Sequence, residues 1–187
     1  MMAFARPKKR EPVGEAELFE YAVATLARGM RTVRDLRRLM KTRAHEGEAG
    51  EQDMDRVVER LIDLKYLSDT RFAADYTRLR KENQGFGRRR VQQDLALKGV
   101  DKDLAATTLE SAYGESDEVE LARAYCTRKR IKQPSGPDAQ KETVRVMNRL
   151  MRAGYGAGAI FKLLRSWSVE VPGEGEGDSD QYDLPEF

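Results

Sequence analysis

Apolar residues recur every three or four positions from about residue 15 to residue 168, which is the spacing of amphipathic helices. Glycines, prolines or short polar segments separate one apolar stripe from the next, as is typical where helices end. Thr32, Asp101 and either Ser68 or Asp69 stand where a side chain can cap the helix that follows. The best candidate for a β-strand, residues 169–171, is too short to matter. The pattern therefore predicts an all-α fold.

The helical pattern also repeats along the chain with an offset of 55 residues. This offset places Gly99 over Gly154 and Leu95 over Leu150, and the same step back from Leu95 reaches Met40. A three-helix unit of this size buries little apolar surface alone, so neighbouring units are expected to stack as they do in helical repeat proteins. The sequence therefore predicts three tandem three-helix repeats that form an elongated, curved array.

Composition changes at both ends of the helical region, where basic residues precede it and acidic residues follow it. Both ends are predicted to be disordered because they carry charge, glycine and proline but few apolar residues. The predicted segments are a disordered basic arm (1–14), repeat 1 (15–67), repeat 2 (68–114), repeat 3 (115–169) and an acidic disordered tail (170–187).

The net charge of +2 hides an uneven distribution of charge. The tail holds seven acidic residues and no base, so residues 1–169 carry 34 bases against 25 acids, a net charge of +9. Such asymmetry favours a nucleic acid or an acidic protein as partner, with a tail that competes for the same surface.

Catalytic and metal-binding chemistry has little support in the sequence. His45 is the only histidine and has no Ser, Cys or Asp at motif spacing, and Cys126 fits a structural thiol better than a nucleophile. The glycines at 85–87 and 154–158 lack the strand and the Gly-Lys-Ser/Thr context of phosphate-binding loops, and they are better suited to ending helices and letting helices approach closely. We therefore expect no enzymatic activity, no metal, no cofactor and no small-molecule substrate.

The expected location is the cytoplasm. The sequence has no apolar run near 18 residues that could cross a membrane, and its N-terminus lacks the apolar stretch of a signal peptide. A single cysteine is also typical of a reducing compartment. No membrane partner is expected.

Basic residues are the strongest candidates for function, and Arg88, Arg89 and Arg90 stand out among them. They open a predicted helix, where the helix dipole makes each cation unfavourable by roughly 0.3–1 kcal/mol. Three arginines in that turn suggest side chains presented to carboxylates or phosphates. A second group, residues 128–132, is interpreted equally well as an ordinary solvated face or as a partner contact.

Three motifs of the middle segment occur in the order and spacing of one known family. They read Y-L-S-D-T-R-F-A at residues 66–73, G-F-G-R-R-R-V at 85–91 and L-A-L-K-G-V at 95–100, with Tyr76 and Arg78 between the first two. With these motifs the chain resembles the RecX family of recombination regulators. The resemblance continues more weakly over residues 16–168 and implies three tandem three-helix repeats.

The resemblance implies a non-enzymatic regulator that binds the RecA recombinase and its filament on DNA. Such a regulator lodges along the filament groove and limits filament growth, ATP hydrolysis, strand exchange and co-protease activity. The candidate partner-binding residues are Arg71, Arg78, Arg80, Arg88, Arg89, Arg90 and Lys98, with a secondary basic patch of Arg128, Lys129, Arg130 and Lys132.

Alternatives to this interpretation remain open. Arg71 could instead pair with Asp69 or Asp75, and the chain could act as a sequence-nonspecific DNA-binding module that occupies single- or double-stranded DNA. The chain also departs from the family pattern, because it has Ser68 where an acid is usual and Arg88 where proline is frequent. The acidic tail lies outside the shared pattern and argues against strong direct DNA binding.

Overall fold

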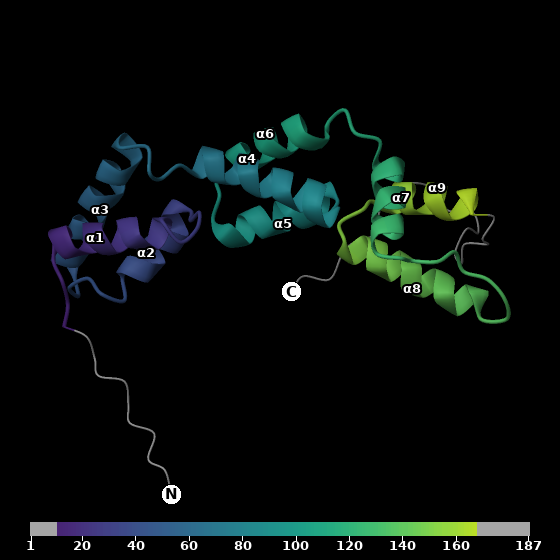
Figure 1. Cartoon of the computed structure of the whole chain (residues 1–187), viewed down its shortest axis with the longest axis horizontal. Helices are drawn as coiled ribbons and strands as arrows, with labels where there is room; N and C mark the ends of the chain where they lie inside the picture. The colour runs from purple at the N-terminus through teal and green to yellow at the C-terminus, as the bar shows by residue number, and fades with distance from the viewer. Residues whose placement is uncertain (1–10, 168–187) are drawn as a thin grey trace, which may run out of the picture. The chain divides into compact units, whose positions relative to one another are not determined.

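The structure, a computed structural model, describes residues 11–167, and these residues form nine α-helices and one short π-helix (Figure 1). The only β-type pairing among them is an isolated bridge between Val13 and Ala44. The predicted all-α fold is confirmed. The helices are α1 (Glu15–Leu26), α2 (Val33–Met40), α3 (Glu48–Asp63), α4 (Asp69–Leu79), η1 (Arg80–Gln84), α5 (Arg88–Lys98), α6 (Lys102–Tyr113), α7 (Glu118–Arg128), α8 (Ala139–Arg152) and α9 (Ala157–Ser166).

Three expectations lie wholly or largely outside the described residues. These are the disordered arm, the short strand candidate at 169–171 and the acidic tail. Among residues 11–167, no helix combines the length and the apolar character that a membrane span requires.

Side-chain caps begin four of the helices. The side-chain oxygens of Thr32, Ser68, Asp101 and Asp117 accept hydrogen bonds from backbone N–H groups in the first turn of α2, α4, α6 and α7. Each such cap stabilises its helix by about 0.5–2 kcal/mol. Of the two candidates before α4, Ser68 is therefore the cap. Asp69 instead accepts a 2.9 Å hydrogen bond from the backbone N–H of Val33, at the start of α2.

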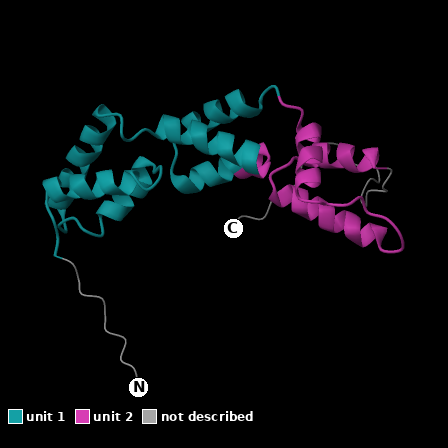
Figure 2. Cartoon of the chain, viewed as in Figure 1, with its two compact units in different colours: residues 1–83, 91–115 teal, residues 84–90, 116–187 magenta. Residues whose placement is uncertain are grey.

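The chain divides into two compact units, shown in Figure 2. Unit 1 comprises residues 1–83 and 91–115, and unit 2 comprises residues 84–90 and 116–187. Helix α5 therefore begins in unit 2 and continues in unit 1. Within the units, α1 packs against α3, α4 against α6 and α7 against α9. This pairing recurs once in each predicted repeat, while the boundaries of three separate repeats stay a prediction.

The core of unit 1 consists of the inner faces of its helices. Phe72 and Ala73 of α4 are buried, as are Val91 and Leu95 of α5 and Leu109 of α6. Tyr76 is partly buried and stacks on Phe72 with ring centroids 5.4 Å apart. The cluster formed by α1–α3 and the turn after them contains Leu18, Ala22, Leu36, Met40, Ala44, Met54, Val57, Val58, Leu61 and Leu67.

The core of unit 2 is arranged around Tyr155, which is only 2% exposed. Its hydroxyl group shares its proton between the backbone carbonyls of Gly85 at 2.6 Å and Leu121 at 3.0 Å. Phe86 packs against the same cluster and is half-buried, so it closes this joint rather than presenting a free stacking surface. The cluster contains Ala122, Tyr125, Cys126, Val146, Leu150, Ala153, Tyr155, Ile160, Leu163 and Leu164.

Candidate partner-binding surfaces

Arg80 belongs to a hydrogen-bonded network inside unit 1. Its guanidinium group lies 3.2 Å from Asp94 Oδ2, donates a hydrogen bond to the Tyr76 hydroxyl and sits 4.8 Å above the Tyr76 ring. The Asp94 side chain is only 7% exposed, and both the Arg80 guanidinium and the Tyr76 hydroxyl contact its carboxylate. The contacts give Arg80 a structural role inside unit 1, while its part in binding a partner stays a prediction.

Lys98 also makes contacts inside unit 1. Its ammonium group lies 3.4 Å from Asp35 Oδ2 on α2, and its backbone carbonyl accepts a 2.7 Å hydrogen bond from the Thr32 hydroxyl. Arg34 of α2 donates to the carbonyls at the end of α5 and so satisfies acceptors that a helix end leaves open. The next residue, Gly99, has φ +76°, and a Cβ there would lie 2.1 Å from Arg34 Nε. The K-G-V motif thus seats the end of α5 on α2.

Arg78 lies between two carboxylates on the surface of unit 1. It is 3.4 Å from Asp75 and 3.5 Å from Glu82, spacings of three and four residues along one helical face. All three side chains are about half exposed, so each pair contributes little to stability. Arg78 therefore remains available for exchange with a partner's acidic group.

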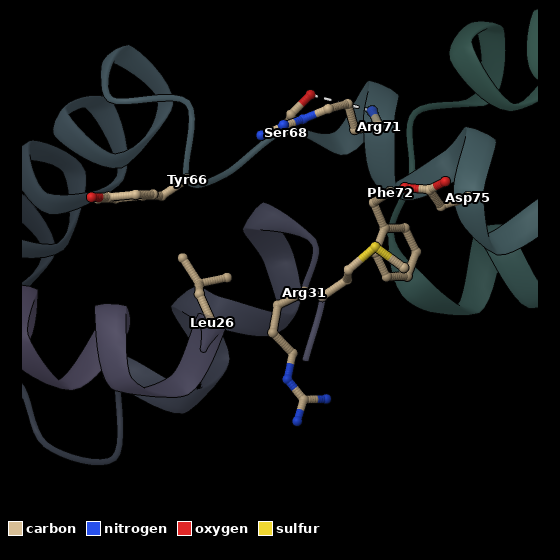
Figure 3. A pocket seen from close by; sticks show the side chains of 8 residues that line it. Leu26, Arg31, Tyr66, Ser68, Arg71, Phe72 and Asp75 are labelled. Carbon is tan, nitrogen blue, oxygen red and sulfur yellow. Dashed lines mark hydrogen bonds between the residues drawn. The ribbon is translucent and has the colours of Figure 1, made fainter. Parts of the chain in front are cut away.

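Arg71 borders a small groove at the start of α4 (Figure 3). Its guanidinium group donates to the backbone carbonyl of Lys65, in the turn that precedes α4, instead of pairing with Asp69 or Asp75. Tyr66, 60% exposed, lies at the groove on the side of α3. The remaining lining residues are Leu26, Met30, Arg31, Ser68, Phe72 and Asp75.

Arg88, Arg89 and Arg90 are all exposed and belong to unit 2. The preceding Gly87 donates its N–H to the Ala153 carbonyl at 2.8 Å, and Arg89 donates its N–H to the Gly154 carbonyl at 3.3 Å. The first turn of α5 is therefore attached to the end of α8.

Two glycines make this close approach possible. A Cβ at Gly87 would lie 2.5 Å from the Gly154 carbonyl oxygen, and a Cβ at Gly154, where φ is +93°, would lie 2.3 Å from the Arg90 backbone nitrogen. Both contacts are with backbone atoms, which cannot move aside cheaply. The expectation of close helix approach is confirmed for Gly87 and Gly154, whereas a Cβ at Gly158 would meet nothing within 4 Å.

The secondary patch, Arg128, Lys129, Arg130 and Lys132, is exposed at and beyond the end of α7. Cations at a helix C-terminus are favoured by the helix dipole, so stability alone accounts for Arg128 and Lys129. Lys129 also lies 5.9 Å from the centre of the Tyr125 ring. Arg130 has φ +52°, an uncommon backbone conformation for a residue other than glycine.

The described residues of unit 2 have a net positive charge, whereas those of unit 1 have a net negative charge. Its residues 84–90 and 116–167 hold 14 Lys and Arg against five Asp and Glu, a net charge of +9. Residues 11–83 and 91–115 of unit 1 hold 16 Lys and Arg against 20 Asp and Glu, a net charge of −4. The basic character predicted for the whole helical region therefore belongs to unit 2.

Sequence reasoning missed the basic residues of α8. Lys141, Arg145, Arg149 and Arg152 are all exposed, and their spacing of three or four residues was the available signal. The last two lie in the final turn of α8, next to the first turn of α5. Together the two elements make one basic surface on unit 2.

The two candidate catalytic side chains show no catalytic arrangement. Burial raises the pKa of the Cys126 thiol, which keeps the group protonated and weakly nucleophilic. His45 lies exposed in the loop before α3. Within residues 11–167, no group of three or more His, Cys, Asp and Glu side chains is placed to hold a metal ion.

Comparison with known proteins points to one family. Residues 68–109 match the family model described as "RecX, second three-helix domain". The chain is 32% identical over 129 residues to the "Regulatory protein RecX" of Trichlorobacter lovleyi, an alignment that covers 68% of this chain and 80% of that protein. It is 29% identical over 154 residues to the protein of the same name from Mycobacterium ulcerans, covering 82% of this chain and 86% of the relative.

The fold agrees with these sequence matches. The crystal structure of RecX from Lactobacillus salivarius superimposes with a TM-score of 0.63 at 18% identity, covering 82% of this chain and 96% of that chain. At this level of identity the likeness concerns the fold.

Proposed function

This chain belongs to the RecX family of regulatory proteins, and we propose that it regulates the RecA recombinase by binding RecA and its filament on DNA. Binding limits filament growth, and with it ATP hydrolysis, strand exchange and co-protease activity. The effect is steric and electrostatic, without a catalytic step, and it takes place in the cytoplasm.

The basic surface of unit 2 is the observation that carries this proposal. Arg88–Arg90 stand in an unfavourable position for the dipole of α5, and the paired glycines at 87 and 154 attach their turn to α8. The first turn of α5 keeps three arginines despite their unfavourable interaction with the helix dipole, and its backbone is held in place by α8. Such a turn is suited to binding acidic side chains and phosphates together. A nucleoprotein filament offers both along one groove.

The proposed partner-binding set also includes five other residues, some of which contact the partner directly and some of which act indirectly: Arg71, Arg78, Arg80, Arg89 and Lys98. Arg89 extends the surface of unit 2, and the exposed Arg78 can exchange its carboxylate partners for those of RecA. Arg71, Arg80 and Lys98 support binding indirectly, since their present contacts shape unit 1. The secondary patch at 128–132 adds to the positive electrostatic potential of unit 2.

Direct DNA binding is the second candidate function, favoured by the net charge of +9 on residues 84–90 and 116–167 of unit 2. A contact with DNA phosphates releases counterions, so its affinity falls steeply with salt, with a log–log slope near the number of phosphates contacted. Binding dominated by RecA keeps its strength at salt concentrations that abolish binding to bare DNA.

ATP hydrolysis by the cognate RecA on single-stranded DNA tests the proposal. The natural chain is titrated in parallel with an Arg88→Ala/Arg90→Ala variant and a matched Arg28→Ala/Lys102→Ala variant, which removes two exposed cations from unit 1. Hydrogen bonds to charged groups contribute roughly 1.5–3 kcal/mol each, so the first variant should need at least about tenfold more protein for half-inhibition. The control should match the natural chain.

Two results contradict the proposal. If the natural chain does not inhibit ATP hydrolysis at one protein per RecA, it does not regulate RecA in the way proposed. If both variants lose inhibition equally, Arg88 and Arg90 have no special role in binding. If hydrolysis falls only as bare DNA is saturated, with the same salt dependence, occupation of DNA is the function instead.

A further inference from the structure

The strongest opposite charges of this chain are neighbours in sequence. Unit 2 has a net charge of +9 over its described residues, and residues 170–187 that follow contain seven acids and no base. The same segment ends in Q-Y-D-L-P-E-F, which places Tyr182, Leu184 and Phe187 among its last acids. It therefore combines negative charge with apolar anchors.

Helix α8 exposes a surface of matching chemistry. Val144 and Met151 are 43% and 49% exposed, and their spacing of seven residues puts them on one face of the helix. The exposed cations Lys141, Arg145 and Arg152 form the adjacent row. An apolar strip beside a basic row is complementary to an acidic segment with interspersed apolar side chains.

The basic row does not stop at the end of α8. Backbone hydrogen bonds from Gly87 and Arg89 to the carbonyls of residues 153 and 154 attach the first turn of α5 there. Arg88–Arg90 thereby extend the row, and we call the combined surface the α8 face. It comprises Lys141, Val144, Arg145, Met151, Arg152 and Arg88–Arg90.

We propose that the C-terminal segment of the same chain, residues 170–187, docks on the α8 face. Its acids at 174, 176, 178 and 180 meet the basic row, and Tyr182, Leu184 and Phe187 cover Val144 and Met151. The 20 residues after Trp167 can span up to about 66 Å when extended, against about 21 Å for the length of α8, so the segment has ample reach.

The docked segment covers the arginines that the proposed function assigns to the partner. A RecA filament or a nucleic acid must then displace it, which lowers apparent affinity and favours partners with a dense array of negative charge. This consequence rests on the proposed function, whereas the docking itself does not.

Paramagnetic relaxation in the full-length chain tests the docking without any partner. A nitroxide is attached through Ser179→Cys, while buried Cys126 stays in place and the unsubstituted chain shows that Cys126 is not labelled. At 50 mM NaCl, backbone amide signals of α8 and the first turn of α5 should fall below half their diamagnetic intensity, while those of α1–α3 keep theirs. Uniform broadening, or none on the α8 face, overturns the proposal.

Two further measurements decide between this segment and other occupants. Broadening that appears only when nitroxide-labelled chains are mixed with isotope-labelled chains means that a second copy supplies the segment, which also overturns the proposal. Replacing Tyr182, Leu184 and Phe187 by Ser should reduce the broadening at least twofold at unchanged charge. Unchanged broadening would contradict the proposal that these apolar side chains contribute to docking.

Competition is measured with a fluorescent 30-residue oligo(dT) as the polyanionic probe. A tail variant converts Glu174, Glu176, Asp178 and Asp180 to amides, and a control of equal net charge converts the exposed Glu20, Glu46, Glu59 and Asp63 of unit 1. The tail variant should bind at least about fivefold more tightly than the control. Equal affinities, or no binding by any of the proteins, overturn the competition, and neither result depends on an effect on RecA.

Discussion

The two units use their basic residues in opposite ways. In the described residues of unit 1 acids outnumber bases, and three candidate cations are paired with acids: Arg80 with Asp94, Lys98 with Asp35, and Arg78 with two surface acids. In the described residues of unit 2, 84–90 and 116–167, five carboxylates cannot pair one to one with 14 cations. A cluster of arginines in a sequence therefore has to be judged against the acids that the folded unit around it supplies.

The backbone joint of unit 2 gives the largest expected effect. Gly154→Ala should lower the free energy of unfolding of unit 2 by about 3 kcal/mol, because alanine is strained at φ +93° and its Cβ would lie 2.3 Å from the Arg90 nitrogen. Urea unfolding followed by the fluorescence of Trp167, the only tryptophan and a neighbour of the unit 2 core, measures the change.

Gly158→Ala is the matched control for this joint. Its Cβ would meet nothing within 4 Å, and a helical glycine costs about 0.5–1 kcal/mol relative to alanine, so this variant should be slightly more stable than the natural chain. Similar losses in both variants would mean that the basic surface is not fixed by the contact between residues 87–90 and 153–154.

The internal pairing of unit 1 gives a smaller effect. Asp94→Ala should cost about 2 kcal/mol, because it removes a carboxylate partner of half-buried Arg80 and a partner of the Tyr76 hydroxyl. Asp75→Ala removes an exposed partner of Arg78 and should change stability by less than about 0.5 kcal/mol. Thermal unfolding followed by circular dichroism measures both.

Equal effects of these two substitutions would contradict the view that unit 1 uses some of its cations for structural ion pairs. They would place Arg80 with the exposed arginines, as the sequence alone does. A near-zero effect of both would indicate that unit 1 does not depend on its ion pairs.

What the sequence predicts well is the periodic part of the molecule. The apolar stripes and the caps at Thr32 and Asp101 predict the helices because both depend on residues close in sequence. The motifs at 66–100 identify the family for the same reason. Ion pairs between residues far apart in sequence cannot be predicted from the local pattern. The residues around Lys98 do not indicate that Asp35, 63 residues away, is its partner.

The candidate site is predicted only where charge is unfavourable locally. Arg88–Arg90 are conspicuous because they oppose the dipole of their own helix, and the structure places them on the basic unit. The cations of α8 create no local conflict, because they alternate with apolar residues at helical spacing and the last two lie in the final turn, where the helix dipole favours them. Their contribution emerges only when the acids within each folded unit are counted.

The smallest expected effect is on the pH dependence of stability, to which two aspartates of unit 1 contribute with opposite signs. Burial raises the pKa of Asp69 in the folded chain, although its hydrogen bond from the Val33 N–H opposes the shift. Its contribution to stability is therefore complete below the unfolded pKa and is lost as pH rises through the folded pKa. Asp69→Asn keeps an acceptor for Val33, so the variant should gain stability relative to the natural chain between pH 3 and pH 7.

Asp101 is the counterpart, because hydrogen bonds from the backbone N–H groups of Leu104 and Asp103 lower its pKa. Its contribution is present above the unfolded pKa and is lost as pH falls through the folded pKa, so Asp101→Asn should lose stability relative to the natural chain over the same interval. Urea unfolding at pH 3 and pH 7 measures both variants. Parallel slopes would contradict the assignment, because a half-buried carboxylate that joins two helices and an exposed cap of one helix must respond to protons with opposite sign.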